Sequence, residues 1–227
     1  TAGTGGFGVK NNSLGGYSSY IQIVVGVFML LCSFNFASYF LVLRGRLKEA
    51  FNSELKGFLA IVAVAVMIVT LNIRHMFGTF GEALKHAFFT VSSIISTTGF
   101  ATVDFDLWPQ LACTVLVLLM FVGACAGSTG GGIKVSRFVI LVKTLGKELT
   151  SYIHPKSIKK IKMEGKPIEH EVVRSTNVYF ITFMIIFAAS VLAVSFEGKD
   201  LITNFTAVAA TINNIGPGLE MVGPTAN

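Results

Sequence analysis

The chain has 227 residues, of which 52% are hydrophobic and only 13% are charged, and its mean hydropathy is +0.69. A soluble domain of this length carries about a quarter charged residues, so the composition excludes an ordinary soluble protein. The formal net charge of +6 would suit nucleic acid, but most of the basic residues gather in two loops between apolar stretches. We therefore expect no nucleic-acid partner.

Four apolar stretches predict an all-α integral membrane protein. Crossing the hydrocarbon core of a bilayer takes about 20 mostly apolar residues. We expect membrane segments over about Tyr17–Leu43, Lys56–Met76, Leu107–Thr150 and Val172–Phe196. The basic loops, near residues 44–56 and 134–174, belong in the cytoplasm by the positive-inside rule. The first segment therefore runs inward and the second runs outward.

Two shorter segments on the outer side form an internal repeat. Gly81–Phe100 and Gly198–Pro217 each hold a helix-length stretch followed by a glycine turn, and they align without a gap at a separation of 117 residues. The aligned identities are Gly81 with Gly198, Leu84 with Leu201, Phe88 with Phe205 and Gly99 with Gly216. We interpret the unit as helix, short re-entrant helix, glycine loop and helix. Thr4-Gly5-Gly6-Phe7 matches Thr97-Thr98-Gly99-Phe100 and predicts the end of an earlier copy.

The repeated glycine loops suit the passage of a dehydrated cation. Such an ion needs oxygen ligands in place of water, and backbone carbonyls supply them without a buried carboxylate. Several carbonyls can face one axis only where the backbone leaves regular helix geometry, which glycine permits. Irregular backbone is tolerated at membrane depth where it lines a wet cavity. Thr97–Phe100 and Asn214–Pro217 meet these demands, and the short helix before each would direct its negative C-terminal end at the pathway.

A run of ten small residues, Gly123–Gly132, interrupts the third membrane segment. The apolar stretch before it, Gln110–Val122, spans only ~20 Å as a helix, and three consecutive glycines disfavour its continuation. A phosphate-binding loop would need Gly-Lys-Ser/Thr in sequence, whereas Ile133 separates Gly132 from Lys134. Close helix packing is another use of small residues. We interpret the run as a flexible intramembrane loop.

Four longer stretches carry a family resemblance. They are Gly123–Arg137 (GACAGSTGGGIKVSR), Ser96–Ala101 (STTGFA), Asn213–Leu219 (NNIGPGL) and His154–Ile168 (HPKSIKKIKMEGKPI). Together they resemble the pore-forming subunit of Trk/Ktr-type potassium uptake systems, and the pair Asn35-Phe36 fits the same family. The likeness covers the whole chain, and the HPKSI stretch favours the Trk branch.

The resemblance implies a fold of repeated helix, pore-helix, filter-loop and helix units around a pseudo-fourfold pore. The family has four such units. Residues 1–55 would be the end of the second unit (filter tail, inner helix and cytoplasmic loop), residues 56–171 the third with its broken inner helix and basic cytoplasmic loop, and residues 172–227 the fourth through its filter. The first unit and the final helix, which carries a basic residue near the intramembrane loop, have no counterpart here. We therefore expect a fragment that does not conduct alone.

The resemblance also implies function and site. It predicts potassium transport by a non-enzymatic, multi-pass protein of the bacterial plasma (inner) membrane, with K⁺ as the transported ion and no organic cofactor. Backbone carbonyls would bind K⁺ at Thr4, Gly5, Gly6, Thr97, Thr98, Gly99, Asn214, Ile215 and Gly216. The intramembrane gate would contain Gly123, Gly127, Ser128, Thr129, Gly130, Gly131 and Gly132.

The implied partners are a second copy of the chain in a homodimer, a cytosolic nucleotide-binding regulatory ring and the lipid bilayer. Two filter segments depart from strict fourfold likeness, namely Gly3-Thr4-Gly5-Gly6-Phe7 and the segment that ends in Pro217. Sodium-coupled or weakly selective uptake of monovalent cations therefore stays open as an alternative.

A membrane-embedded enzyme is an alternative of another class. Ser128 or Thr129 would be its nucleophile, and a nucleophilic hydroxyl needs a general base nearby. The four histidines are predicted far from this loop, on the outer side (His75, His86) or in the cytoplasmic loop (His154, His170). The sequence therefore favours transport, and we expect no catalytic residues.

Overall fold

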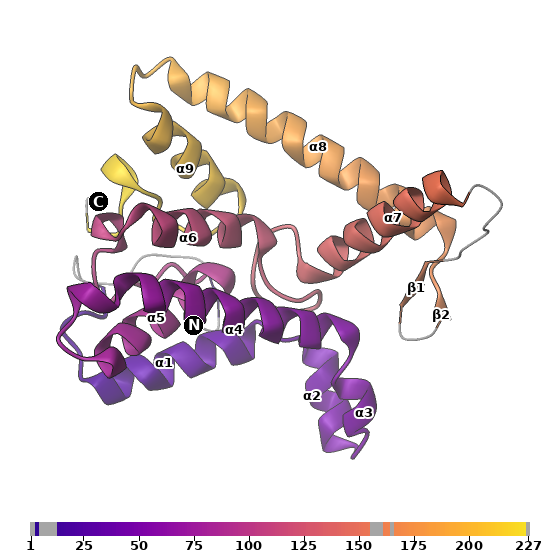
Figure 1. Ribbon diagram of the computed structural model, residues 1–227, viewed down its shortest axis with the longest axis horizontal. Helices are drawn as coiled ribbons and strands as arrows, with labels where there is room; N and C mark the ends of the chain where they lie inside the picture. The colour runs from indigo at the N-terminus through magenta and orange to yellow at the C-terminus, as the bar shows by residue number, and fades with distance from the viewer. Residues whose placement is uncertain (1–2, 5–12, 155–160, 164–165, 226–227) are drawn as a thin grey trace.

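The computed structural model describes residues 3–4, 13–154, 161–163 and 166–225, and these residues are mostly helical (Figure 1). The first part of the chain forms α1 (Ser19–Cys32), α2 (Phe36–Leu43), α3 (Leu47–Ala50), α4 (Ser53–Ile73) with the 3₁₀ turn η1 (Arg74–Met76), and α5 (Phe80–Ile95). The rest forms η2 (Phe105–Leu107), α6 (Gln110–Val122), α7 (Val135–Ile153), the antiparallel strands β1 (Lys162–Met163) and β2 (Lys166–Pro167), α8 (His170–Ser195), α9 (Leu201–Ile212) and η3 (Glu220–Val222).

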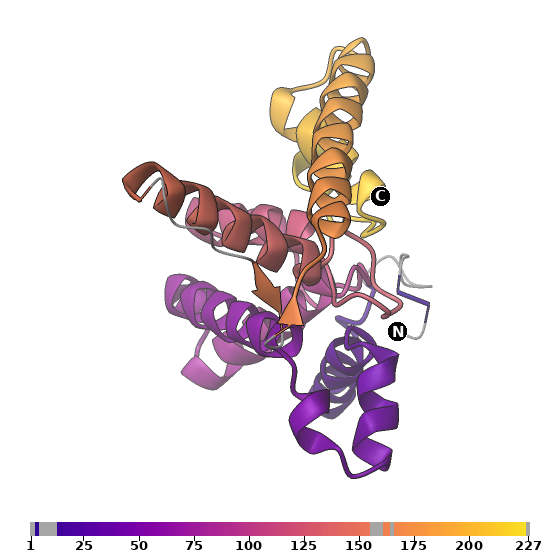
Figure 2. The same ribbon diagram turned by 90° about the vertical axis from the view of Figure 1, so that its right-hand side faces the viewer.

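The long helix α4 packs against α5, α6 and α7. Helix α5 also contacts α1 and α6, and α8 contacts α7 and α9. Figure 2 shows α8 and α9 at one end of the molecule and α2 with α3 at the other. The two short helices α5 and α9 therefore lie on the two sides of α6, which contacts both of them.

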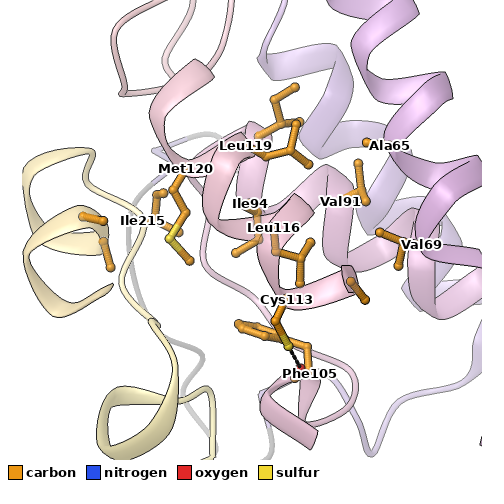
Figure 3. Packing of buried hydrophobic residues seen from close by; sticks show 14 of the residues in the cluster. Ala65, Val69, Val91, Ile94, Phe105, Cys113, Leu116, Leu119, Met120 and Ile215 are labelled. Atoms are coloured by element: carbon orange, nitrogen blue, oxygen red, sulfur yellow. Dashed lines mark hydrogen bonds between the residues drawn. The ribbon is translucent and has the colours of Figure 1, made fainter. Parts of the chain in front are cut away.

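The apolar core lies where α4, α5 and α6 meet (Figure 3). Val69 of α4, Val91 of α5 and Leu116 of α6 are all fully buried. Ile215, from the loop after α9, lies beside Met120 of α6 (Figure 3) and is also fully buried. This loop is thus anchored by an apolar side chain, because burying a large aliphatic group is worth about 1.5–3 kcal/mol.

Two helical segments, Ser53–Met76 and His170–Ser195, are long and apolar enough to cross a membrane, and a bent pair of helices raises the number to three in the part of the chain that the structure describes. Helix α8 exposes large apolar side chains along its length, among them Ile181, Ile185 and Leu192. Such a surface would aggregate in water but is compatible with contact to lipid or to other apolar helices. The fold is therefore the predicted all-α membrane protein.

The first apolar segment differs from the prediction of one helix over Tyr17–Leu43. It is divided into α1 and α2, which are bent by 92° relative to one another. Asn35 Oδ1 caps α2 by accepting a hydrogen bond from Ala37 N (2.8 Å). Asparagine favours such N-cap positions, so one local signal for the break was present. The backbone groups freed by the break also need partners at membrane depth, and these come from elsewhere in the chain.

Candidate functional site

The loop Ser96–Phe100, which we name the α5 loop, is shaped by hydrogen bonds to the last turns of its own helix. Three backbone N–H groups donate backwards: Ser96 N to Ser92 O (3.1 Å), Thr97 N to Ile94 O (3.1 Å) and Thr98 N to Ser93 O (2.9 Å). Helix α5 ends at Ile95 because these bonds close its final turn. The chain then leaves the helix axis within two residues.

The loop Asn213–Pro217, which we name the α9 loop, repeats this pattern in the predicted register. Its bonds run from Asn213 N to Ala209 O (3.2 Å), from Asn214 N to Thr211 O (3.1 Å) and from Ile215 N to Ala210 O (2.8 Å). Every donor and acceptor lies 117 residues after its counterpart in the α5 loop. Helices α5 and α9 also end at equivalent residues, Ile95 and Ile212. The gapless alignment thus corresponds to the same backbone geometry.

Both loops use the left-handed backbone region at equivalent positions. Thr97 has a φ of 56° and Asn214 a φ of 57°, while Gly99 and Gly216 have φ values of 79° and 110°. Thr4, which aligns with Thr97, has a φ of 34°, and its predicted neighbours Gly5 and Gly6 lie outside the described residues. Left-handed geometry costs a residue with a side chain roughly 1–2 kcal/mol. Its recurrence in three related motifs marks a backbone shape imposed by the surrounding structure.

The side chains that support the two loops are different. In the α5 loop, Ser93 Oγ donates to Phe100 O (2.6 Å), and the hydroxyls of Ser96 and Thr98 share a hydrogen bond (2.7 Å). In the α9 loop, Asn213 Nδ2 donates to Ala209 O (2.9 Å). One backbone shape is therefore supported by hydroxyl groups in one loop and by an amide and the buried Ile215 in the other.

The two helices themselves begin with side-chain caps. Thr79 Oγ1 accepts from Glu82 N (3.2 Å) at the start of α5. At the start of α9, Asp200 accepts from Thr203 N (2.8 Å) and from Thr203 Oγ1 (2.6 Å). These bonds from Thr203 hold the pKa of the Asp200 carboxyl below its ordinary value.

The predicted break in the third membrane segment is present. Helix α6 ends at Val122, α7 begins at Val135, and the residues between them include the glycine loop, Gly123–Gly132. Its two ends touch: a Cβ on Gly123 would lie 2.5 Å from Gly131 O and 2.8 Å from Gly132 Cα. Gly123 and Gly132 also have φ values of 70° and 77°. Glycine is required at this closure because a side chain at either end would collide with backbone.

The glycine loop contacts all three candidate filter segments. Thr4 Oγ1 donates to Thr129 O (2.7 Å), and Gly131 N donates to Thr97 Oγ1 (2.6 Å). Gly131 also approaches the α9 loop so closely that a Cβ there would lie 2.3 Å from Asn213 O. The structure thus brings segments from three parts of the sequence to one loop. Asn214 Nδ2 joins two of them directly by donating to Thr4 O (3.3 Å).

The glycine loop also supplies partners for the break between α1 and α2. Cys125 N donates to Ser33 O (3.0 Å), Phe36 N donates to Gly127 O (3.1 Å) and Thr129 Oγ1 donates to Cys32 O (3.3 Å). Backbone groups released by the bend are in this way paired inside the protein, as membrane depth requires. The bend between α1 and α2 therefore depends on contacts with a segment that is distant in the sequence.

One acidic residue at this site was missed by the sequence reasoning. Glu54 lies in the first turn of α4 and is 4% exposed. Its Oε1 accepts from Ala126 N (2.6 Å) and from Ser136 N (3.2 Å). The prediction started the second membrane helix at Lys56 and left Glu54 in the cytoplasmic loop. The available signal was an Asn-Ser-Glu start directly before an apolar run.

The polar groups at this site are mainly carbonyl and hydroxyl oxygens. Ser128 Oγ, one of the two alternative nucleophiles, donates to Cys125 O (2.6 Å). Among the described residues, no three or more His, Cys, Asp or Glu side chains come together as a metal site would require. Arrays of backbone and hydroxyl oxygens are suited to hard monovalent cations.

Known proteins resemble this chain over almost its whole length. The family model described as "TrkH: Cation transport protein" matches residues 1–225. The Trk system potassium uptake protein TrkH of Salmonella typhimurium is 32% identical over 227 residues, which cover 98% of this chain and 47% of that protein. The Trk system potassium uptake protein TrkG of Escherichia coli (strain K12) is 34% identical over 232 residues, which cover 100% of this chain and 47% of that protein.

The fold has a solved counterpart. The crystal structure of the potassium transporter TrkH from Vibrio parahaemolyticus matches with a TM-score of 0.90 at 32% identity and covers 97% of this chain and 49% of that one. The chain thus spans about half the length of the curated relatives it matches. The chain belongs to the TrkH family of cation transport proteins, which are transporters and not enzymes.

Proposed function

We propose that the chain is part of a protein that takes up potassium ions through a carbonyl-lined filter closed by an intramembrane gate. The relatives' names describe them as potassium uptake proteins. One observation carries the proposal for this chain: three segments with related left-handed backbone meet at one glycine loop, through Thr129, Gly131 and their partners Thr4 and Thr97. A filter needs several carbonyl-bearing segments around one axis, and a gate needs a barrier next to them.

The proposed ion ligands are the carbonyls of Thr4–Gly6, Thr97–Gly99 and Asn214–Gly216. The paired hydrogen bonds in the α5 and α9 loops support this assignment, because they fix the backbone of both loops in one shape. Fixed carbonyls replace the water of a dehydrated ion at low cost. The C-terminal ends of α5 and α9 add a partial negative charge next to these loops.

The proposed gate is the glycine loop. Its main chain lies against the hydroxyl groups of Thr4 and Thr97 and against Asn213 O, so an ion leaving these segments would meet it. Its small side chains let the backbone change shape at low cost. A loop of this kind can occupy closed and open states, as a gate must.

The wider assignments follow the family. Residues 1–55, 56–171 and 172–227 would be the end of the second pore unit, the third unit and the fourth unit through its filter. The full-length protein would be a homodimer in the bacterial inner membrane, regulated by a cytosolic nucleotide-binding ring. The fold match over 97% of the chain supports this division.

Uptake of rubidium, a potassium analogue, tests the proposal. The full-length gene is expressed in a bacterial strain without its own potassium uptake systems, and rubidium entry is measured with and without excess potassium or sodium. We expect saturable uptake that potassium inhibits and sodium inhibits far less. Equal inhibition by both ions would instead support weakly selective uptake. Absence of rubidium uptake, with the protein present in the membrane, would contradict the proposal.

A further inference from the structure

Glu54 is a buried carboxylate that the transport proposal leaves without a role. It belongs to the first turn of α4, yet its side chain is 4% exposed. A carboxylate removed from water is costly unless hydrogen bonds compensate for the lost solvation. The bonds it accepts come from the backbone of the glycine loop and of the helix that follows. Its partners therefore lie 72 and 82 residues away in sequence.

A single oxygen of Glu54 joins both sides of the glycine loop to α4. Ala126 N, 2.6 Å from Glu54 Oε1, belongs to the first half of the glycine loop. Ser136 N, at 3.2 Å, belongs to the first turn of α7, directly after the loop. The first N–H groups of a helix have no partner within it, and that end carries partial positive charge. Glu54 thus caps α7 from another helix and ties the loop to the same point.

The local sequence offers α7 no cap of its own. Lys134 is at the N-cap position, and its side chain makes no capping hydrogen bond. That side chain donates instead to Gly130 O inside the loop. The remaining contacts described above between the loop and distant segments join neutral groups, such as Cys125 N with Ser33 O. Hydrogen bonds that involve a charged group are about twice as strong as neutral ones, so Glu54 is the strongest of these attachments.

We propose that Glu54 is the positioning residue of the gate, whose carboxylate holds the glycine loop against the α5 and α9 loops. Its removal frees the loop but leaves the backbone bonds of the α5 and α9 loops to their own helices in place, because the described bonds of Glu54 go to Ala126 and Ser136 and not to these loops. The predicted rise in ion flux rests on the proposed function. The predicted release of the loop does not.

Cys125 and Cys113 provide a direct readout of loop release. Cys125 belongs to the glycine loop and is 1% exposed, while Cys113 belongs to α6 and is 6% exposed. Cys113 Sγ lies 3.4 Å from Phe105 O in the core (Figure 3). A buried thiol reacts with a maleimide only when its surroundings open. Release of the loop would expose Cys125 alone, whereas general unfolding would expose both.

The experiment uses the full-length protein in lipid vesicles and three variants. Glu54→Ala removes the carboxylate, Glu54→Gln keeps the size and one acceptor oxygen, and Glu49→Ala is the matched control. Glu49 pairs with Arg46 (2.6 Å) on the surface, away from the loop. Maleimide labelling of each cysteine is followed by peptide mass spectrometry, and rubidium flux and the preference for potassium over sodium are measured in the same vesicles.

We expect Cys125 to react about tenfold faster or more in Glu54→Ala, by a smaller factor in Glu54→Gln, and at the original rate in Glu49→Ala. Cys113 should react at the original rate in all of them, and flux should rise while ion preference stays constant. Unchanged Cys125 reactivity in Glu54→Ala, or a parallel rise at Cys113, would overturn the positioning role. A rise at Cys125 alone with unchanged flux would support the positioning role and overturn the glycine loop as the gate.

Discussion

The α5 and α9 loops and the glycine loop are all rich in small or glycine residues, but they are held in opposite ways. The α5 and α9 loops are each fixed mainly by bonds to their own helix, between residues three to seven positions apart. The glycine loop has short-range bonds as well, but the bonds that attach it to other segments reach residues between 34 and 125 positions away, from Thr97 to Thr4. The α5 and α9 loops therefore keep their shape as long as their own helices are intact. The glycine loop keeps its position only while distant parts of the fold stay together.

This difference suits the two proposed roles. A selectivity filter needs carbonyls whose spacing does not change, and local bonds to a helix end provide that. A gate needs a shape that can be left, and a few bonds to separate elements can be broken without unfolding a helix. The contrast gives three predictions beyond the uptake and cysteine-labelling experiments.

The largest effect is expected from shortening the glycine loop. Deleting Gly131 removes the bond to Thr97 Oγ1 and the close approach to Asn213 O. Rubidium flux through the full-length protein should rise on the order of tenfold, because a loss of about 1.4 kcal/mol in the free energy that favours the closed state is a factor of ten. Ion preference should not change. Deleting Gly45, in an exposed turn with open space around it, is the control. Lower or equal flux in a folded deletion variant would contradict the gating role of the glycine loop.

A smaller effect is expected from Gly99→Ser in the α5 loop. Gly99 has a φ of 79°, which a serine adopts at a cost of roughly 1–2 kcal/mol. The strained backbone should shift its carbonyls and lower the preference for potassium over sodium by up to about tenfold. The protein should still insert in the membrane, and Gly81→Ser, where nothing lies within 4 Å of an added Cβ, should keep its preference. Unchanged selectivity in Gly99→Ser would count against a filter role for this loop.

The smallest effect concerns pH and the start of α9. Thr203 bonds hold the pKa of Asp200 below its ordinary value of 3.8. The stabilisation is therefore complete above that value and is lost as the pH falls through the lower pKa of the folded state. Asp200→Asn keeps an acceptor but does not titrate. The melting temperature of the unmodified protein should lie above that of Asp200→Asn by a constant amount above about pH 5 and by less in acid. A pH-independent difference would show that the carboxylate charge does not stabilise this helix.

Features that depend on neighbouring residues can be predicted from the sequence of this chain. The apolar run of α8 and the break at Gly123–Gly132 could be read directly, because hydrophobic length and glycine content act within one segment. The 117-residue register was also readable, and the structure repeats the same backbone bonds in that register. Helix ends and the turns after them are encoded within about five residues, so their geometry follows from the local chain.

Which distant segments contact one another depends on the packing of the whole fold. The bend between α1 and α2 depends on backbone partners from Cys125 and Gly127, and the position of the glycine loop depends on Thr4, Thr97 and Glu54. One residue in the sequence, Asn35, indicated the bend. Glu54 was predicted to lie in the first cytoplasmic loop. No local pattern specifies a bond between residues 72 or 125 positions apart. Such bonds form because the packing of the helices brings distant segments together, and a backbone group that is buried without a partner is costly.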